Sequence, residues 1–581
     1  MNTANVHKPY LRLLPVQVAA IMAGAVNSLV DTVMTAHFLG PDAVAGIGFF
    51  CPVLTVIYLC YVVLNGTQIL CGRAIGSGKS NDAVSLFSTA LATVLGYGIL
   101  LSLGALLLRA QLAALLGAKG NALACLKDYI IGFMPGVPFM ILSCSMMMFM
   151  PCNNDLKRSY VIMGIMVASN AVLNLVLIRA AGMGMTGLGL ASSLSYLFSA
   201  ALMFPRFLRS DRVYRFSPRS LCFSRMKEAA RLGLPELLFN AGVTLRTYLL
   251  NLTVMGALGA SGVAALNVEF SLLSFLSAIP CGVSRSCTLL GSIYYGERDR
   301  QSLTEVTSFA LKCGLILSVS MTAAVMAFSA RIASAFFLSG TDAWLMTRQM
   351  LLCFASIFVW NTLFTVLLRI YQIQDHLLAV NILNFAEQAL YGLLAVVGIR
   401  LIGAAGVWVA NPLADILCLI AIFAWIRIKL KHIPRTLEQW MLLPQDFGAR
   451  PEDVLEFTVG GMEDVVNVSR TLMDFCRERN VPLRYRTIVG LSVEEMAGNV
   501  IQHGSDRSGK STVEIRLVAE DTLVIRLRDN CRAFDPKQRV GQFDPEDPAK
   551  NAGIRMIARL ADEMDYHNDA GINTLLIRIS P

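Results

Sequence analysis

Long apolar runs follow one another from near the N-terminus to about Lys431, and they constrain the fold more than any other feature. A helix needs about 20 mostly apolar residues to cross a bilayer, and on that criterion we predict about twelve spans. They are centred near Ala25, Ile57, Val94, Pro138, Val167, Leu197, Val243, Phe275, Leu317, Ile357, Leu393 and Leu419. A chain with this pattern folds as an all-α membrane bundle.

The last part of the chain belongs to a different class. Charged residues make up only 15% of the whole chain, against roughly 25% in soluble proteins, yet they are frequent after residue 448. There, short alternating segments are interleaved with amphipathic helices, as in an α+β sandwich. We therefore predict a first lobe at 1–218, a second lobe at 219–432, a linker at 433–448 and an α+β domain at 449–581.

Basic residues gather in the connections on one side of the predicted bundle. They include Arg73, Lys79, Lys157, Arg158 and the segment 206–227, whereas the opposite connections hold few. Because Lys and Arg favour cytoplasmic loops, we expect a multi-pass protein of the cytoplasmic membrane with both termini in the cytoplasm. The net charge of +9 is then a property of these loops. No basic patch interleaved with aromatic residues indicates a nucleic-acid partner.

An internal repeat is visible. The segment Thr32–Gly46 matches Thr253–Ala265, and each leads into a long span that ends in a turn, at Gly76 and Gly296. A weaker match relates 150–155 to 370–375. Two lobes of six spans that enter the membrane from the same side are typical of alternating-access transporters.

This pattern resembles the multidrug and toxic compound extrusion (MATE) family. The resemblance is carried by Asn27-Ser-Leu-Val-Asp31, by Leu39-Gly-Pro-Asp-Ala-Val-Ala, by Gly76-Ser-Gly and by their copies in the second half, and it covers roughly residues 10–430. It implies export of organic, often cationic, compounds, driven by an inward flow of protons or sodium ions.

Asp31 is the main candidate for ion coupling. It lies in the middle of the first span, where burying a charge is costly and an acid is usually functional. The resemblance implies that an acid there takes part in proton or sodium coupling. The alternative is a structural acid capped by nearby hydroxyl groups. Asn170 and Asn174 share one face of the fifth span. Many prokaryotic relatives have Asp at the second position, so Asn174, which cannot titrate, departs from the pattern.

Other polar groups interrupt the apolar runs. Glu269 and Glu387 are further candidates for transport or coupling, together with Glu236, Arg246 and Asp415. An arginine paired with one of these acids is a common structural solution. The clusters Met146–Met150 and Met163–Met166 are more often core residues than a substrate surface, although adaptable methionines suit promiscuous binding.

Three motifs in the tail carry chemistry. Glu495, Asn499 and His503 are spaced by four and share one helix face, where an amide oxygen can hold Mg²⁺ and a carboxylate can act as a base. Asp529, followed by Phe534, comes directly after a predicted strand. Its carboxylate can accept a hydrogen bond from an adenine amino group. The segment Asn551-Ala-Gly553-Ile554 opens a helix, and backbone N–H groups at such an end suit phosphate.

The order and spacing of these motifs resemble the ATP-binding domain of histidine kinases, gyrase and chaperones, in its anti-sigma-factor serine-kinase branch. The resemblance covers about 450–581 and implies ATP and Mg²⁺ as cofactors. By it, Asn499 would hold magnesium, Glu495 would be the base, Asp529 would read adenine and Gly553 would line the phosphate loop, and Thr574 would make a further contact. Two departures are Cys531, where glycine is usual, and Ala552, where the phosphate loop loses a glycine.

We therefore predict an ion-gradient-coupled exporter in the lipid bilayer with a cytosolic ATP-binding regulatory domain. A protein partner of that domain would be a STAS-type antagonist or a sigma-factor-like protein. One alternative is a membrane-anchored serine kinase that uses the bundle as a receptor. Another is a flippase for lipids or cell-wall precursors.

Overall fold

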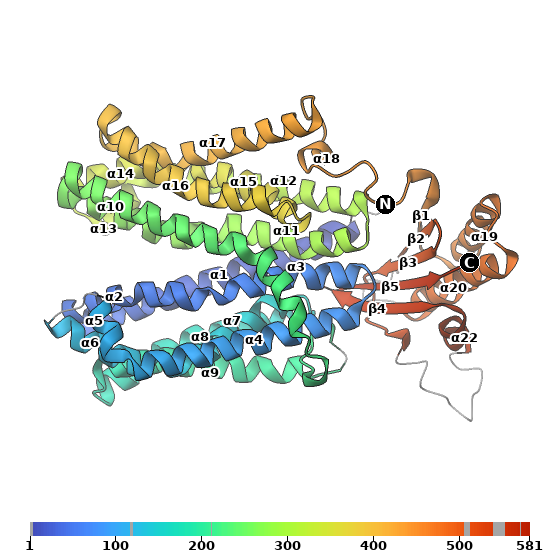
Figure 1. Ribbon diagram of the computed structural model, residues 1–581, viewed down its shortest axis with the longest axis horizontal. Helices are drawn as coiled ribbons and strands as arrows, with labels where there is room; N and C mark the ends of the chain where they lie inside the picture. The colour runs from blue at the N-terminus through green and yellow to red at the C-terminus, as the bar shows by residue number, and fades with distance from the viewer. Residues whose placement is uncertain (1–3, 117–119, 211, 505–511, 538–551, 570) are drawn as a thin grey trace.

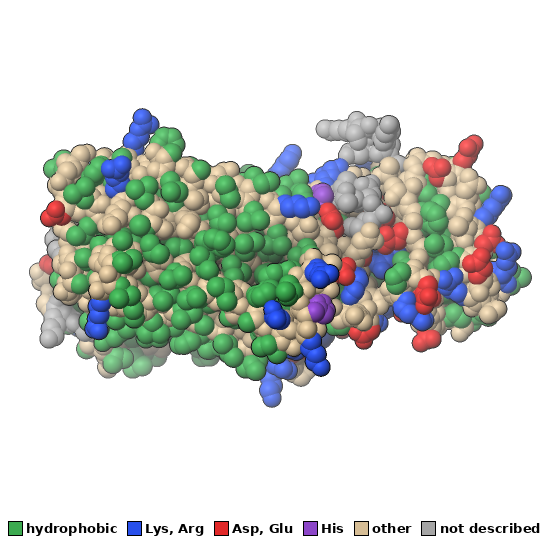
Figure 2. Space-filling view, turned by 90° about the horizontal axis from the view of Figure 1, so that it is seen from above, with side chains coloured by type: hydrophobic (Ala, Val, Ile, Leu, Met, Phe, Trp, Pro, Cys, Tyr) green, Lys and Arg blue, Asp and Glu red, His purple; other side chains and the backbone are tan. Residues whose placement is uncertain are grey.

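The computed structural model describes the chain except for residues 1–3, 117–119, 211, 505–511, 538–551 and 570. An elongated helical bundle carries an α+β domain against one of its ends (Figure 1). We call this end of the bundle the near end and the opposite end the far end. Figure 2 shows hydrophobic side chains spread over the flank of the bundle, whereas charged side chains gather over the α+β domain. That distribution fits a body embedded in lipid and a domain in water.

The first lobe contains nine α-helices among its described residues. They are α1 (Ala4–Phe38), α2 (Pro41–Tyr58), α3 (Cys60–Gly76), α4 (Ser80–Leu107), α5 (Arg109–Leu115), α6 (Gly120–Phe133), α7 (Val137–Phe149), α8 (Leu156–Asn174) and α9 (Gly184–Phe207). A π-helical segment, Leu175–Ala180, extends α8.

The second lobe is built in the same way. Its helices are α10 (Met226–Leu276), α11 (Ala278–Gly296), α12 (Arg300–Ala327), α13 (Ser329–Phe336), α14 (Asp342–Phe354), α15 (Ile357–Ile373), α16 (Leu377–Ile402) and α17 (Ala404–Leu430).

The structure accounts for eleven of the twelve expected spans. Ten helical stretches of the described residues are long and apolar enough to cross a membrane, and the bent pair α14 and α15, at 43°, makes an eleventh. The segment centred near Val243 is not among them. It forms the first part of α10, up to the break at Gly259, and its apolar run is interrupted by Arg231, Glu236 and Arg246.

The backbone confirms the internal repeat. Residues with positive φ recur at equivalent places in the two lobes: Gly40 (85°) and Gly259 (64°), Gly78 (73°) and Arg298 (53°), Asn154 (59°) and Asp375 (65°). The first pair lies within the matched segments, where it separates α1 from α2 and breaks α10, and the second pair belongs to the turns that follow Gly76 and Gly296. The third places Asn154, rather than Asp155, opposite Asp375, so the register of the weaker match shifts by one residue.

The C-terminal domain follows the linker helix α18 (Leu437–Trp440). Its elements are β1 (Val454–Val459), α19 (Met462–Glu478), α20 (Leu483–His503), β2 (Val513–Ala519), β3 (Leu523–Asp529), α22 (Ala552–Leu560), β4 (Glu563–Asp569) and β5 (Ile572–Ile579). The strands form one antiparallel sheet in the order β1-β2-β3-β5-β4. The α+β architecture is confirmed. We expected the last helix to end at Glu563, but α22 ends three residues earlier, at Leu560. Strand β4 was not predicted from the sequence.

The two faces of this sheet have different neighbours. Helices α19, α20 and α22 pack on one face around a core that includes Val489, Ile515, Ile525 and Ile577. The other face is turned toward the near end of the bundle (Figure 1). Because side chains alternate along a strand, each strand presents apolar residues to the helices and a second set to the bundle.

Glycines bring the two lobes together at the near end. Helix α3 of the first lobe packs against α10 and α11 of the second, whereas α2 packs on α1 and α6 of its own lobe. A Cβ built on Gly76 would lie 1.9 Å from the Ile293 carbonyl oxygen, and one built on Gly296 would lie 2.3 Å from the Arg73 carbonyl oxygen. A Cβ on Gly72 would meet the Ser292 hydroxyl at 1.9 Å. We call Gly72, Gly76 and Gly296 the glycine seam, because their missing side chains allow this approach.

Candidate functional sites in the bundle and the C-terminal domain

A cavity of about 460 Å³ lies between the lobes. Most of its wall belongs to the first lobe and includes Asp31, and the second lobe contributes Glu236, Asn240 and Arg285. Aromatic and methionine side chains make up much of the surface: Tyr58, Tyr61, Tyr129, Tyr196, Met140, Met147, Met148, Met163 and Met166. Several members of the two methionine clusters thus line the cavity, although Met146, Met148 and Met150 also belong to the hydrophobic core.

Asp31 is the centre of a polar cluster on this wall. Asn174 donates a hydrogen bond to Asp31 Oδ1 at 2.7 Å, and the Ser192 hydroxyl donates one to Asp31 Oδ2 at 2.9 Å. Asn170 donates to Ser192 Oγ at 3.2 Å and accepts from Asn174 at 3.2 Å. The structure therefore brings the three first-lobe candidates together. Ser192, on α9, completes the cluster, and no spacing pattern along the chain would have identified it.

The second-lobe acids lie apart from this cluster. Glu269 is fully buried and accepts hydrogen bonds from the Tyr391 hydroxyl at 2.7 Å and from Asn411 at 3.3 Å. The Arg246 guanidinium stacks on the Tyr391 ring at 5.5 Å. Glu269 is thus held within a polar core of its own lobe.

Glu387 forms a third polar group. It accepts a hydrogen bond from Asn361 at 3.2 Å, and it is 6% exposed. Asp415 is also buried in the second lobe, at 1% exposed. Neither Glu387 nor Glu269 is among the residues that line the 460 Å³ cavity.

In the C-terminal domain, two of the predicted motifs lie side by side. Glu495 and Asn499 are half-buried on α20, one turn apart. Gly553, near the start of α22, is so close to α20 that a Cβ built on it would lie 2.0 Å from Glu495 Oε2. A side chain at 553 would therefore displace the Glu495 carboxylate from its present position. Ile554 is 2% exposed and belongs to the hydrophobic core between helices and sheet.

Asp529 ends β3 on the helix-covered face. Its Oδ1 accepts hydrogen bonds from the Cys531 backbone N–H at 2.9 Å and from Asn573 Nδ2 at 2.7 Å. Burial raises the pKa of Asp529, while the hydrogen bonds from Asn573 and Cys531 act in the opposite direction. Cys531, where glycine was expected, is buried with its thiol in contact with this carboxylate, so it shapes the site without displacing Asp529.

One expected contact is wrong. Thr574 pairs with Arg528, and Asn573 pairs with Asp529. Residues directly opposite in an antiparallel pair share a face, so Thr574 points toward the bundle and Asn573 takes the place expected for it. The sequence predicts the strand, but it does not show which of these two adjacent residues faces the helix-covered side of the sheet.

The remaining candidates of the C-terminal domain lie at the edge of the candidate nucleotide site or outside the described residues. The backbone N–H of Phe534 donates a hydrogen bond to the Tyr566 hydroxyl at 3.1 Å, and its ring is exposed. His503 is the last residue of α20, and its side chain lies outside the described part of the structure, as does Asn551 of the phosphate-loop motif.

Comparison with known proteins agrees with both parts. The model of the MatE family matches residues 19–177 and 235–397, one segment in each lobe. The model of the histidine kinase-like ATPase domain matches residues 461–579. The two halves of the bundle and the ATP-binding-type tail are thus recognised separately, as the repeat and the change in composition predicted.

Relatives and solved structures match the bundle. The chain is 24% identical over 330 residues to a probable multidrug resistance protein NorM of Photorhabdus laumondii, covering 54% of this chain and 70% of that protein. It is 22% identical over 312 residues to the multidrug export protein MepA of Staphylococcus aureus, covering 52% and 68%.

Among solved structures, a multidrug resistance MATE transporter in an outward-facing conformation superposes with a TM-score of 0.68 at 20% identity, covering 74% of this chain and 98% of that one. A MATE transporter in complex with MaL6 gives 0.67 at 21% identity, covering 74% and 99%. The fold of the bundle is therefore that of these transporters. Since the family model covers more than half of the residues, in two repeated segments, the chain belongs to the MatE family.

Proposed function

We propose that this protein exports organic cations through the cavity between its lobes, driven by an inward flow of protons or sodium ions. The observation that carries the proposal is Asp31, an acid within a membrane-spanning helix that lines the cavity. Acids in such positions mark ion pathways because their protonation or ion binding changes the cost of burial. The export proteins to which the chain is similar support the same direction of transport.

The chemistry of the cavity supports a cationic aromatic substrate. Asp31 and Glu236 place two carboxylates on its wall, and four tyrosine rings provide π faces. A cation over such a ring gains about 0.5–2 kcal/mol, depending on how well it is desolvated. The flexible thioethers of the methionines adapt to different shapes. Arg285 adds one positive charge to the same wall.

Transport into proteoliposomes tests the coupling. A fluorescent organic cation is followed under a proton gradient, under a sodium gradient and with neither, for the wild type and for Asp31→Asn. Asp42→Asn is a matched control, since Asp42 is exposed and pairs only with Asn121 at 3.2 Å among the described contacts. We expect gradient-driven transport to be lost in Asp31→Asn alone. Full gradient-driven transport by this variant would refute the assignment.

For the C-terminal domain we propose regulatory ATP binding with Mg²⁺. The basic connections lie at the near end, so the positive-inside rule places this end and the domain in the cytoplasm, where ATP is available. Asp529 and Asn573 would hold the adenine, Gly553 would border the phosphates, and Asn499 would supply an oxygen to Mg²⁺. ATP itself brings the phosphate groups that Mg²⁺ bridges.

Binding of a fluorescent ATP analogue to the full chain tests this role. We expect magnesium-dependent binding in the wild type and in Gln502→Ala, a control on the exposed side of α20. Asn499→Ala should lose the magnesium dependence. Equal binding by Asn499→Ala with and without Mg²⁺, at wild-type affinity, would exclude Asn499 as the metal ligand.

Phosphotransfer to a STAS-type antagonist or another small protein is a second role for the same site. Glu495 is the candidate base because it lies one turn from Asn499 on the same face of α20. Incubation of the full chain and a candidate partner with labelled ATP tests it. Transfer that persists in Glu495→Gln would rule out this residue as the base.

A further inference from the structure

The sheet face that is turned toward the bundle carries a row of arginines. Arg516 on β2 and Arg526 and Arg528 on β3 all project from this face, opposite to the core residues of the same strands. Arg526 and Arg528 are 4% and 2% exposed. Arginine is almost never buried without a partner, so this face is covered by something that compensates three positive charges.

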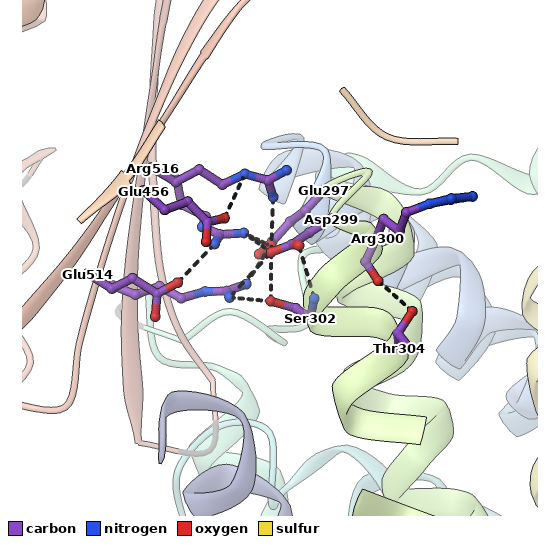
Figure 3. A network of polar contacts seen from close by, with 10 residues as sticks. Glu297, Asp299, Arg300, Ser302, Thr304, Glu456, Glu514 and Arg516 are labelled. Atoms are coloured by element: carbon purple, nitrogen blue, oxygen red, sulfur yellow. Dashed lines mark hydrogen bonds and ion pairs between the residues drawn. The ribbon is translucent and has the colours of Figure 1, made fainter. Parts of the chain in front are cut away.

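The compensating charges come from the second lobe. The turn between α11 and α12 carries Glu297 and Asp299, and Figure 3 shows the arginines converging on it. Arg526 Nη1 lies 2.7 Å from Glu297 Oε2, and Arg516 Nη1 lies 3.0 Å from Asp299 Oδ2. Arg528 also pairs with Glu297.

Further side chains of both the bundle and the sheet contact this network. Arg528 stacks over the Tyr294 ring at 4.8 Å and donates to the Ser302 hydroxyl at 3.4 Å. Glu514 accepts from Arg526 at 3.2 Å and from Asn5 of α1 at 2.9 Å. Asp299 is 1% exposed. Its burial favours the neutral form, but Arg526, Arg516 and Arg528 outweigh this and hold the pKa of Asp299 well below its usual range.

The same sheet also contacts the first lobe. Arg578 on β5 donates to the backbone carbonyl of Ser77, and the Ser80 hydroxyl donates to Asp565 on β4. Leu576 packs against Gly78, where a Cβ would lie only 3.1 Å from its side chain. The contacted residues, 77–80, form the turn between α3 and α4.

These two turns occupy equivalent places in the repeat. Gly78 and Arg298 have φ of 73° and 53° two residues after Gly76 and Gly296, which are both members of the glycine seam. One sheet face therefore holds the matching turns of the two lobes, directly beside the seam where the lobes are in backbone contact. A single antiparallel sheet with a packed core does not stretch, so it cannot follow both turns when they separate.

We propose that the C-terminal domain is a clamp on the transporter: its sheet face holds the turns 77–80 and 297–299 together and keeps the near end of the bundle closed. The near end opens only when at least one turn leaves the sheet. The proposal rests on the proposed function only in that the lobes separate at this end during transport. It assigns the face opposite to the nucleotide site to regulation.

The arrangement on β3 connects the two faces. Arg528 contacts the bundle, and the next residue, Asp529, lies in the candidate nucleotide site. Their partners on β5 are Thr574 and Asn573, again adjacent and on opposite faces. A ligand that moves the end of β3 would therefore move Arg528 directly, with no other helix or strand between the nucleotide site and the bundle.

Distances between labels in the full chain, in lipid nanodiscs without substrate or gradient, test the clamp. The chain has fourteen cysteines, so spin labels are attached through unnatural amino acids at three exposed positions. These are Lys157 in the first lobe, Leu378 in the second lobe and Thr471 on α19. Pulsed electron resonance then reports the spacing of the lobes at the near end and the position of the domain.

Two variants each weaken the contact of the C-terminal domain with one lobe. Asp299→Asn can still cap α12 through the Ser302 N–H, at 3.0 Å in the wild type, but it removes a carboxylate that both Arg516 and Arg526 contact. Arg516 keeps its pair with Glu456, and Arg526 keeps Glu297 and Glu514. Arg578→Ala removes the contact with Ser77. The control is Arg477→Ala, which breaks an exposed ion pair with Asp474, 3.1 Å long, on the far side of α19.

We expect both variants, but not the control, to add a population with longer Lys157–Leu378 distances. Because these arginines keep other carboxylates, we expect Asp299→Asn to shift the ratio of open to closed about tenfold or more. The clamp is refuted if the domain leaves the bundle while the spacing of the lobes stays at the wild-type value. It is also refuted if the domain stays docked in both variants. Neither readout depends on the substrate or the coupling ion, so failure of the exporter assignment would be seen separately.

Discussion

Replacing Gly76 with alanine tests the glycine seam directly. A Cβ at this position would lie 1.9 Å from the Ile293 carbonyl oxygen and 2.8 Å from the Glu297 backbone nitrogen. Both neighbours are backbone atoms of α11 and its C-cap, so no side-chain rotation relieves the clash. The lobes must separate by more than about 1 Å to reach ordinary contact distances. Overpacking of this kind typically costs about 1–3 kcal/mol, which corresponds to about a 5- to 150-fold shift toward the open near end.

Gly96→Ala is the matched control for this substitution. Gly96 lies within α4, and a Cβ built there meets no heavy atom within 4 Å. Alanine is favoured over glycine in a helix interior by about 0.5–1 kcal/mol, so the control should be neutral or slightly stabilising.

The label pair Lys157 and Leu378 reports the outcome. We expect a population with longer distances in Gly76→Ala and in Gly296→Ala, its counterpart in the second lobe, and an unchanged distribution in Gly96→Ala. Transport should slow in the first two variants because the cycle passes through the closed near end. If Gly76→Ala and Gly96→Ala gave the same distances and the same transport rate, the seam would not be the contact that closes this end.

Of three further predictions, two concern single hydrogen bonds and one concerns the titration of Asp529. Asn573→Ala should weaken ATP binding about tenfold or more, since a hydrogen bond to a charged group contributes about 1.5–3 kcal/mol, whereas Thr574→Ala should leave it unchanged in the same fluorescence assay. Because burial raises the pKa of Asp529, its carboxylate is lost at a higher pH than usual for Asp. ATP affinity should therefore fall as the pH drops through this raised value, and Asp529→Asn should abolish the dependence. Ser192→Ala should lower thermal stability by about 1–3 kcal/mol by removing a donor to Asp31, and Ser195→Ala, whose hydroxyl bonds only a backbone carbonyl, should cost less.

The features that the sequence predicted are those encoded locally. Most spans are continuous apolar runs, and the long span of each repeat ends in a turn that is marked by Gly76 or Gly296. The spacing of four between Glu495 and Asn499 fixes their common helix face without knowledge of the rest of the fold. These signals depend on neighbours along the chain, so one sequence is sufficient to read them.

The features that were missed depend on contacts between distant segments. Ser192 reaches Asp31 from another helix, and a serine in an apolar span carries no signal of its own. Asn573 and Thr574 are adjacent, and only the pairing of β5 with β3 decides which one joins the nucleotide site. Strand β4 begins soon after α22 ends, and its identity is set by pairing with β5.

The arginine row shows most clearly why a local pattern was insufficient. Alternating Arg516, Arg526 and Arg528 would ordinarily indicate a sheet face open to water, yet the near end of the bundle buries it. The two turns beneath it share a backbone course, but their charges differ: Ser77-Gly78-Lys79 carries one positive charge, and Glu297-Arg298-Asp299 carries two negative charges and one positive. Placing the arginines on the first turn would set them against Lys79. Like charges in contact oppose that arrangement. The two turns are nearly symmetric in backbone, but their different charges allow the domain to dock in one orientation. This orientation places β3 over the second lobe and β4 over the first.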